Sequence, residues 1–245
     1  MRSPARALFI VEMRRLWTWT TILVLVILVL VVAAMSMLSP TPLARVLWWA
    51  YDAFLPIVCV FLSTGIVAND VKSGWMRTLL IRPITRQQYL GAKIAAVVCS
   101  IWIMLLFLGF VPAIVGSLIH RLPMGLDFVP AAGAHLLLLG KSVMLVSVLA
   151  FFSCWLPGIT NIVVLFAWWL LYSMLDFYSM TKSVRWLELL KAYAFPSGFS
   201  NAIDALTQSG VMSWVDIAWG ITGLTGFLAL AFWSITKIQI DVDSE

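Results

Sequence analysis

Long apolar runs separated by short polar connections make up most of this chain of 245 residues. A helix crosses a hydrocarbon core of ~30 Å with about 20 apolar residues, and six segments meet that length. They cover approximately residues 17–38, 46–67, 92–118, 131–155, 159–178 and 212–234. The pattern therefore predicts an all-α integral membrane protein with six transmembrane helices, in which residues 1–245 form a single transmembrane domain.

Composition strengthens this prediction and limits what else the chain can contain. Hydrophobic residues make up 62% and charged residues 11%, and the mean hydropathy is +1.01. Soluble domains are about half apolar and a quarter charged. Six spans leave no room for a soluble nucleotide-hydrolysing domain, and no phosphate-binding loop motif is present, so ATP chemistry would need another chain. The three cysteines lie within apolar runs and give neither a disulfide framework nor a metal-ligand spacing.

The basic residues predict the orientation, because cytoplasmic loops carry an excess of Lys and Arg. With the N-terminus inside, the inner side holds Arg2, Arg6, Arg14, Arg15, Lys72, Arg77, Arg82, Arg86, Lys93 and Lys237. The outer side holds Arg45, Arg121, Lys182, Arg185 and Lys191. Both termini are then cytoplasmic. The net charge of +5 accordingly reports topology, and we expect no nucleic-acid partner.

Two regions outside the spans have amphipathic helical patterns. In residues 1–16 one apolar face predicts a helix lying in the inner interface, with a simple basic anchor as the alternative. Residues 183–208 predict two short helices broken at Pro196, which form an outer hairpin that covers a cavity mouth or, alternatively, lies on the outer leaflet. The apolar residues that we expect to close this outer gate are Trp186, Leu190, Tyr193, Phe195, Phe199 and Ile203.

Enzymatic chemistry has little support in the sequence. Only two histidines occur, and no HExxH or other metal-binding spacing is present, so we expect neither a catalytic site nor a bound metal. Ionisable residues inside spans are costly and become functional candidates, and here they are Lys141, Asp52 and Asp216. Similar estimated depths suggest an ion pair between Lys141 and Asp52; snorkelling or pairing with backbone carbonyls is the alternative.

The loop between the second and third spans carries the most informative motif. Residues 69–82 predict a short helix parallel to the membrane, which Asn69 or Asp70 caps and Pro83 ends. The stretch Asp70-x3-Gly74-x4-Leu79-Leu80-x2-Pro83-Ile84-Thr85-Arg86, followed by Lys93, resembles the same loop in ABC type-2 permeases. Trp75 departs from that family, which often has Thr at this position. The six-span layout is similar along the whole chain.

This resemblance implies a permease subunit of an ATP-driven exporter, located in a prokaryotic inner membrane. Its partners would be two cytoplasmic ATP-binding subunits, which hold the ATP and Mg, and a second permease copy or paralogue, all within membrane lipid. Residues 1–16 would be an elbow helix, and the helix from Asp70 to Leu80 a coupling helix. The residues implied in ATPase coupling are Asp70, Val71, Gly74, Trp75, Met76, Leu79, Pro83 and Arg86.

The aromatic content of two spans suggests the cargo. An aromatic cavity with few charges favours an amphipathic or hydrophobic substrate. Its candidate lining residues are Trp48, Tyr51, Asp52, Phe54, Trp168, Trp169 and Tyr172. Packing against lipid or neighbouring helices explains the same residues. The other functions that we keep open are an integral-membrane enzyme and a non-transporting membrane scaffold.

Overall fold

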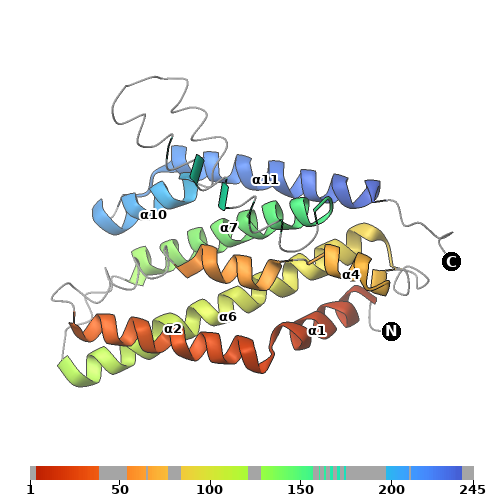
Figure 1. Ribbon diagram of the computed structural model, residues 1–245. Helices are drawn as coiled ribbons and strands as arrows, with labels where there is room; N and C mark the ends of the chain where they lie inside the picture. The colour runs from red at the N-terminus through yellow and green to blue at the C-terminus, as the bar shows by residue number, and fades with distance from the viewer. Residues whose placement is uncertain are drawn as a thin grey trace.

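The computed structural model describes residues 4–38, 54–64, 66–76, 84–120, 128–156, 160, 163, 166–167, 170–171, 174, 197–209 and 211–238. Every regular element in these ranges is helical. The helices are α1 (Pro4–Leu16), α2 (Trp19–Leu38), α4 (Ala68–Lys72), α6 (Arg86–His120), α7 (Phe128–Ser153), α10 (Ser197–Ser209) and α11 (Trp214–Lys237), with another helix over residues 54–63. They lie side by side in an elongated bundle (Figure 1).

Several of these helices have the length and apolarity needed to cross a membrane. Within the described residues four qualify by themselves, namely Phe54–Lys72, which comprises the helix over residues 54–63 together with α4, and Arg86–Leu108, Gly133–Ser153 and Trp214–Lys237. The pair Pro4–Leu16 and Trp19–Ala34, bent by 63°, makes a fifth if it is counted as one span. The structure thus confirms the all-helical class with four to five membrane-length helices. Most of the predicted span 159–178 lies outside the described residues, so the count of six stays a prediction.

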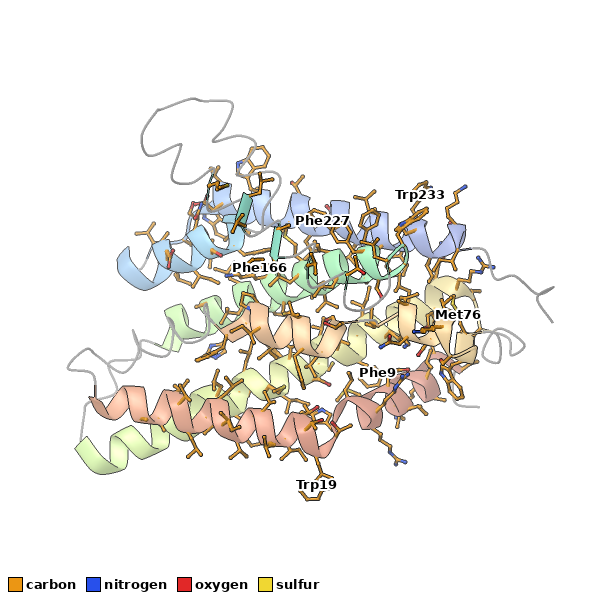
Figure 2. The ribbon with its side chains drawn as sticks, viewed as in Figure 1. Phe9, Trp19, Met76, Phe166, Phe227 and Trp233 are labelled. Atoms are coloured by element: carbon orange, nitrogen blue, oxygen red, sulfur yellow. The ribbon has the colours of Figure 1, made fainter. Side chains whose placement is uncertain are left out.

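Two helices form the centre of the bundle. In both α6 and α7, 61% of the most apolar stretch is buried, against 11% in α11. α6 contacts α1, α2, α7 and α11, and α7 also contacts α10 and α11. Buried residues recur along α6 at helical spacing: Leu90, Ile94, Val97, Ile101, Met104 and Leu108. By contrast, Trp19 at the start of α2 is 87% exposed and points away from the bundle (Figure 2).

α6 begins at Arg86, six residues before the predicted boundary at residue 92. The physical reason is a capping box that we did not read from the sequence. The Thr85 hydroxyl accepts a hydrogen bond from the Gln88 N–H (3.2 Å), and the Gln88 side chain accepts one from the Thr85 N–H (3.2 Å). The earlier start brings Tyr89 and Lys93, four residues apart, onto one face of a helix already formed.

The start of α6 and the end of α11 meet at one end of the bundle. Arg86 Nη1 donates hydrogen bonds to the carbonyl oxygens of Thr236 (3.2 Å) and Ile238 (2.8 Å). The last carbonyls of a helix have no intrahelical partners, and a cation there also opposes the helix dipole. α4 and the N-terminal part of α1 lie at this same end (Figure 1).

α10 packs its predicted apolar face against α7 and α11. Phe199, Ala202, Ile203 and Leu206 are all at most 5% exposed, whereas Asn201 and Asp204 are exposed. Added Cβ atoms at Gly140 and Gly220 would lie 2.8 and 2.9 Å from the Phe199 ring, so these glycines make its pocket. The pattern of this helix is therefore confirmed. The first half of the expected hairpin, with Trp186, Leu190, Tyr193 and Phe195, lies outside the described residues.

Candidate functional site

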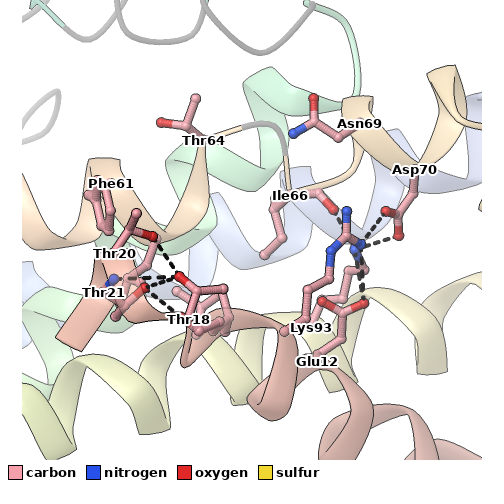
Figure 3. Close-up of a pocket in the computed structure, with 14 residues that line it drawn as sticks. Glu12, Thr18, Thr20, Thr21, Phe61, Thr64, Ile66, Asn69, Asp70 and Lys93 are labelled. Atoms are coloured by element: carbon pink, nitrogen blue, oxygen red, sulfur yellow. Dashed lines mark hydrogen bonds and ion pairs between the residues drawn. The ribbon is translucent and has the colours of Figure 1, made fainter. Parts of the chain in front are cut away.

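Four charged side chains and one tyrosine meet where α1, α4 and α6 come together. Figure 3 shows Glu12, Asp70 and Lys93 among them. Asp70 of α4 is the centre. Its Oδ1 accepts a hydrogen bond from Arg15 Nη1 (2.8 Å), and its Oδ2 lies 2.5 Å from Lys93 Nζ and accepts a hydrogen bond from the Tyr89 hydroxyl (2.7 Å). Lys93 Nζ also lies 3.3 Å from Glu12 Oε1 and donates to the Ile66 carbonyl (2.8 Å). We call Glu12, Arg15, Asp70, Tyr89 and Lys93 the charge cluster.

The charge cluster is deeply buried and electrically balanced. Asp70 is fully buried, Lys93 is 2% exposed and Glu12 is 5% exposed, while the Arg15 side chain is 52% exposed. Two carboxylates face two cations, which is the arrangement that makes burial of charge tolerable. Arg15 lies in α1, before the first predicted span. Its hydrogen bond to Asp70 raises the pKa of its guanidinium, although burial opposes the shift. Each charge therefore depends on the others for its place.

The neighbouring chain fixes the position of α4 and differs from our prediction in two respects. Neither Asn69 nor Asp70 caps this helix. The Ser153 hydroxyl, at the end of α7, instead accepts hydrogen bonds from the N–H groups of Val67 (3.0 Å) and Ala68 (3.1 Å). The helix also ends at Lys72, because Gly74 adopts φ +71°, a left-handed conformation that glycine allows at helix ends. Trp75 and Met76 are helical again, and residues 77–83 lie outside the described residues.

The residues implied in ATPase coupling separate into an outer and an inner set. Val71 and Trp75 are 39% and 42% exposed and form an apolar surface at this end of the bundle. Asp70 and Met76 are buried, so neither side chain is part of that surface. Lys93, which we had placed among the residues of the inner loops, is buried as well. Leu79 and Pro83 lie outside the described residues.

The structure describes few of the residues proposed for the substrate path and for intramembrane charge. Phe54 is half-buried, while Trp48, Tyr51, Asp52, Trp168, Trp169 and Tyr172 lie outside the described residues. Lys141 is 6% exposed within α7, and its proposed pairing with Asp52 stays a prediction. Asp216 lies in the first turn of α11, where its Oδ2 accepts a hydrogen bond from Ser213 (2.5 Å). A carboxylate is favourable at a helix N-terminus, so this position and the Ser213 hydrogen bond together compensate the charge of Asp216.

An open cavity of about 220 Å³ adjoins the charge cluster (Figure 3). The charged side chains of Glu12, Asp70 and Lys93, with Arg15 bonded to Asp70, line one side, and hydroxyl groups from Thr18, Thr20 and Thr64 line the other. Phe61 adds an apolar wall. The cavity follows from the break between α1 and α2, because the 63° bend prevents the two helices from packing continuously along α6.

Sequence reasoning missed Glu12 and did not bring the cluster residues together. Glu12 lies four residues after Leu8, the most buried apolar residue of α1, and so on the face that packs against α6. A carboxylate on the buried face of an amphipathic helix is costly unless it has a partner, and this signal could have identified it. Its partner Lys93 is far away in the sequence, so the pairing itself was not readable.

The charge cluster has the chemistry of a structural connection between α1, α4 and α6, and it offers no arrangement typical of catalysis. Across the described ranges, no three or more His, Cys, Asp or Glu side chains are grouped so that they could hold a metal ion. The carboxylates and cations of the charge cluster neutralise one another, and this joins three segments of the chain. Comparison of the sequence with models of protein families and with characterised proteins finds no match.

Proposed function

We propose that this chain is the permease subunit of an ATP-driven ABC exporter, energised by separate ATP-binding subunits. The observation that carries the proposal is the placement of α4. Its Asp70 is tied to α1 through Arg15 and to α6 through Lys93, while its Val71, and Trp75 just beyond its end, stay exposed. A partner that moves α4 would therefore move two further helices with it.

Buried ion pairs suit such transmission because separating them is costly. Removing one partner of a buried pair typically costs ~3–5 kcal/mol. A force on the surface of Val71 and Trp75 therefore displaces α4 together with α1 and the first turns of α6. The Ser153 cap connects α4 to the end of α7 as well. This makes α4 a coupling helix, in agreement with the family resemblance of the loop from Asp70 to Lys93.

The same proposal assigns the ends of the bundle. The end that carries α4, the start of α6 and the C-terminus of α11 faces the cytoplasm of a prokaryotic cell, since these elements place the basic residues Lys72, Arg86 and Lys237 there. α10 lies at the opposite, outer end and belongs to the gate. Two ATP-binding subunits and a second permease complete the exporter, whose cargo is amphipathic or hydrophobic.

The test is co-purification of the chain with an ATP-binding-cassette subunit in nanodiscs, followed by ATPase measurement. Trp75→Asp introduces a charge into the exposed apolar surface next to α4. Since a central aromatic at an interface contributes about 2 kcal/mol or more, we expect association with the ATPase to weaken by about thirtyfold or more. Substrate-stimulated hydrolysis should fall to the basal rate.

Trp214→Asp is the matched control, because Trp214 is 72% exposed at the opposite end of the bundle. It should bind the ATPase like the wild-type chain. Equal loss in both variants, or normal stimulated hydrolysis in Trp75→Asp, contradicts the coupling assignment. If no ATP-binding subunit associates with the wild-type chain, the proposal fails as a whole, and the membrane enzyme and the scaffold return as candidates.

A further inference from the structure

The cavity beside the charge cluster contains hydrogen-bonding groups that the described protein does not satisfy. Glu12 Oε1 is buried and accepts no hydrogen bond; its distance of 3.3 Å to Lys93 Nζ is an ion pair without hydrogen-bond geometry. Asp70, by contrast, has donors on both oxygens. A buried carboxylate oxygen without a donor costs free energy, so this side of the cavity fits a positively charged donor.

The guanidinium of Arg15, on the same side of the cavity, has N–H donors without a partner among the described residues. Within the described residues, Arg15 hydrogen-bonds through Nη1 alone, and half of its side chain is exposed. A guanidinium has five N–H donors and matches phosphate geometry particularly well. The hydroxyls of Thr18 and Thr20, which hydrogen-bond to each other (2.6 Å), lie across the cavity from the charged residues, and one hydroxyl proton of this pair can be donated to a ligand (Figure 3). The lining therefore fits an anion and an ammonium close together, and neither one alone.

The position of the cavity indicates where such a ligand comes from. It lies at the break between α1 and α2, where Trp17 and Trp19 flank its lining residue Thr18 in the sequence, and tryptophan is enriched at the depth of lipid headgroups. From there the helix over residues 54–63 presents two exposed apolar side chains one turn apart, Phe61 of the cavity wall (46% exposed) and Ile57 (57% exposed). A molecule with its polar end in the cavity would thus have an apolar surface of this helix for its hydrocarbon chains.

We propose that this cavity binds the headgroup of a membrane phospholipid that carries a phosphate and a primary ammonium. The ammonium donates a hydrogen bond to Glu12 Oε1, and the phosphate accepts hydrogen bonds from Arg15 and from one hydroxyl of the Thr18–Thr20 pair. The acyl chains lie against Phe61 and Ile57. A quaternary ammonium has no N–H to donate, so the site discriminates against phosphatidylcholine.

The experiment is native mass spectrometry of the purified full-length chain titrated with phosphatidylethanolamine, phosphatidylcholine and phosphatidylglycerol of identical acyl chains. Because a hydrogen bond to a charged group contributes about 1.5–3 kcal/mol, we expect phosphatidylethanolamine to bind about tenfold more tightly than either other lipid. Glu12→Gln should reduce its affinity to that of phosphatidylcholine. Arg15→Gln should weaken the binding of phosphatidylethanolamine and of phosphatidylcholine by the same factor.

A second pair of variants keeps the test independent of the charge cluster. Thr20→Trp fills the cavity from an exposed position and should abolish the preference, whereas Thr225→Trp, at an exposed site on α11, should bind as the wild-type chain does. Circular dichroism checks that each variant is folded. Equal affinity of the wild-type chain for the three lipids, or an unchanged preference in folded Glu12→Gln or Thr20→Trp, overturns the proposal.

One further measurement separates the lipid from a soluble source of the same headgroup. Phosphoethanolamine is added to the lipid-loaded chain at the concentrations used for the lipid. We expect no displacement, because the free headgroup lacks the contacts of the acyl chains with Phe61 and Ile57. Displacement at equal concentration would assign the site to a soluble ligand and overturn the lipid proposal.

Discussion

Removing Lys93 from the charge cluster provides the sharpest test of how α1, α4 and α6 are held together. Lys93→Met keeps the length of the side chain but leaves Asp70 and Glu12, both at most 5% exposed, with Arg15 as their only cation among the described cluster residues. Arg15 is 2.8 Å from Asp70 but 3.9 Å from Glu12, so it compensates mainly Asp70. The variant therefore has one poorly compensated buried carboxylate.

The magnitude follows from the loss of one partner in a buried ion pair, ~3–5 kcal/mol. The same count predicts a partial rescue. Glu12→Gln removes one negative charge, so in the double variant Asp70 and Arg15 form a neutral pair. We expect the free energy of unfolding of the double variant to exceed that of Lys93→Met by about 1–3 kcal/mol, the usual size of a coupling between contacting residues.

The assay is reversible unfolding in mixed micelles at increasing SDS, followed by far-UV circular dichroism. Lys237→Met, at the exposed end of α11, is the control and should change the free energy of unfolding by less than about 0.5 kcal/mol. A loss below about 1 kcal/mol in Lys93→Met would refute the reasoning, as would a double variant whose loss equals or exceeds the sum of the single losses.

Two further predictions concern the packing of α10 and the position of α4. Gly220→Ala places a Cβ 2.9 Å from the Phe199 ring and should lower the free energy of unfolding by about 1–3 kcal/mol. Gly226→Ala is the control, because its Cβ meets no atom within 4 Å, and it should not lower the stability. Equal thermal stability of the two variants would contradict the glycine pocket. Ser153→Ala removes the cap of α4 and should cost about 1 kcal/mol, seen as faster hydrogen exchange at Val67; unchanged protection there would show that the cap does not stabilise α4.

Features set by local pattern could be predicted from the sequence. Apolar runs of membrane length predict α6, α7 and α11, and the apolar face of Phe199 and Ile203 on α10 is buried as its periodicity indicates. The start of α6 was also readable from Thr85 and Gln88 but was placed too late, because hydropathy alone located the span. Local information was sufficient in each of these cases.

Features that depend on distant residues could not be predicted. The hydroxyl that caps α4 belongs to Ser153, 86 residues after the Val67 N–H that it accepts, and no local signal connects them. An aspartate at this position is typical of a helix cap or of the protein surface. Only the packing of α1 and α6 against α4 makes Asp70 the centre of a buried cluster. Charged residues near span ends can face the partner or the protein interior, and sequence periodicity over the five residues of α4 does not distinguish these outcomes.

The distribution of the charge cluster along the chain also bears on how the protein enters the membrane. Both carboxylates are synthesised before Lys93, so until α6 is made only Arg15 is available to neutralise them. Charged side chains at membrane depth are costly without partners. The segment Phe54–Lys72 and α6 are therefore expected to settle as a pair, and α1 can dock only after α6 has arrived. The final position of α1 therefore depends on Lys93, which is synthesised much later than α1.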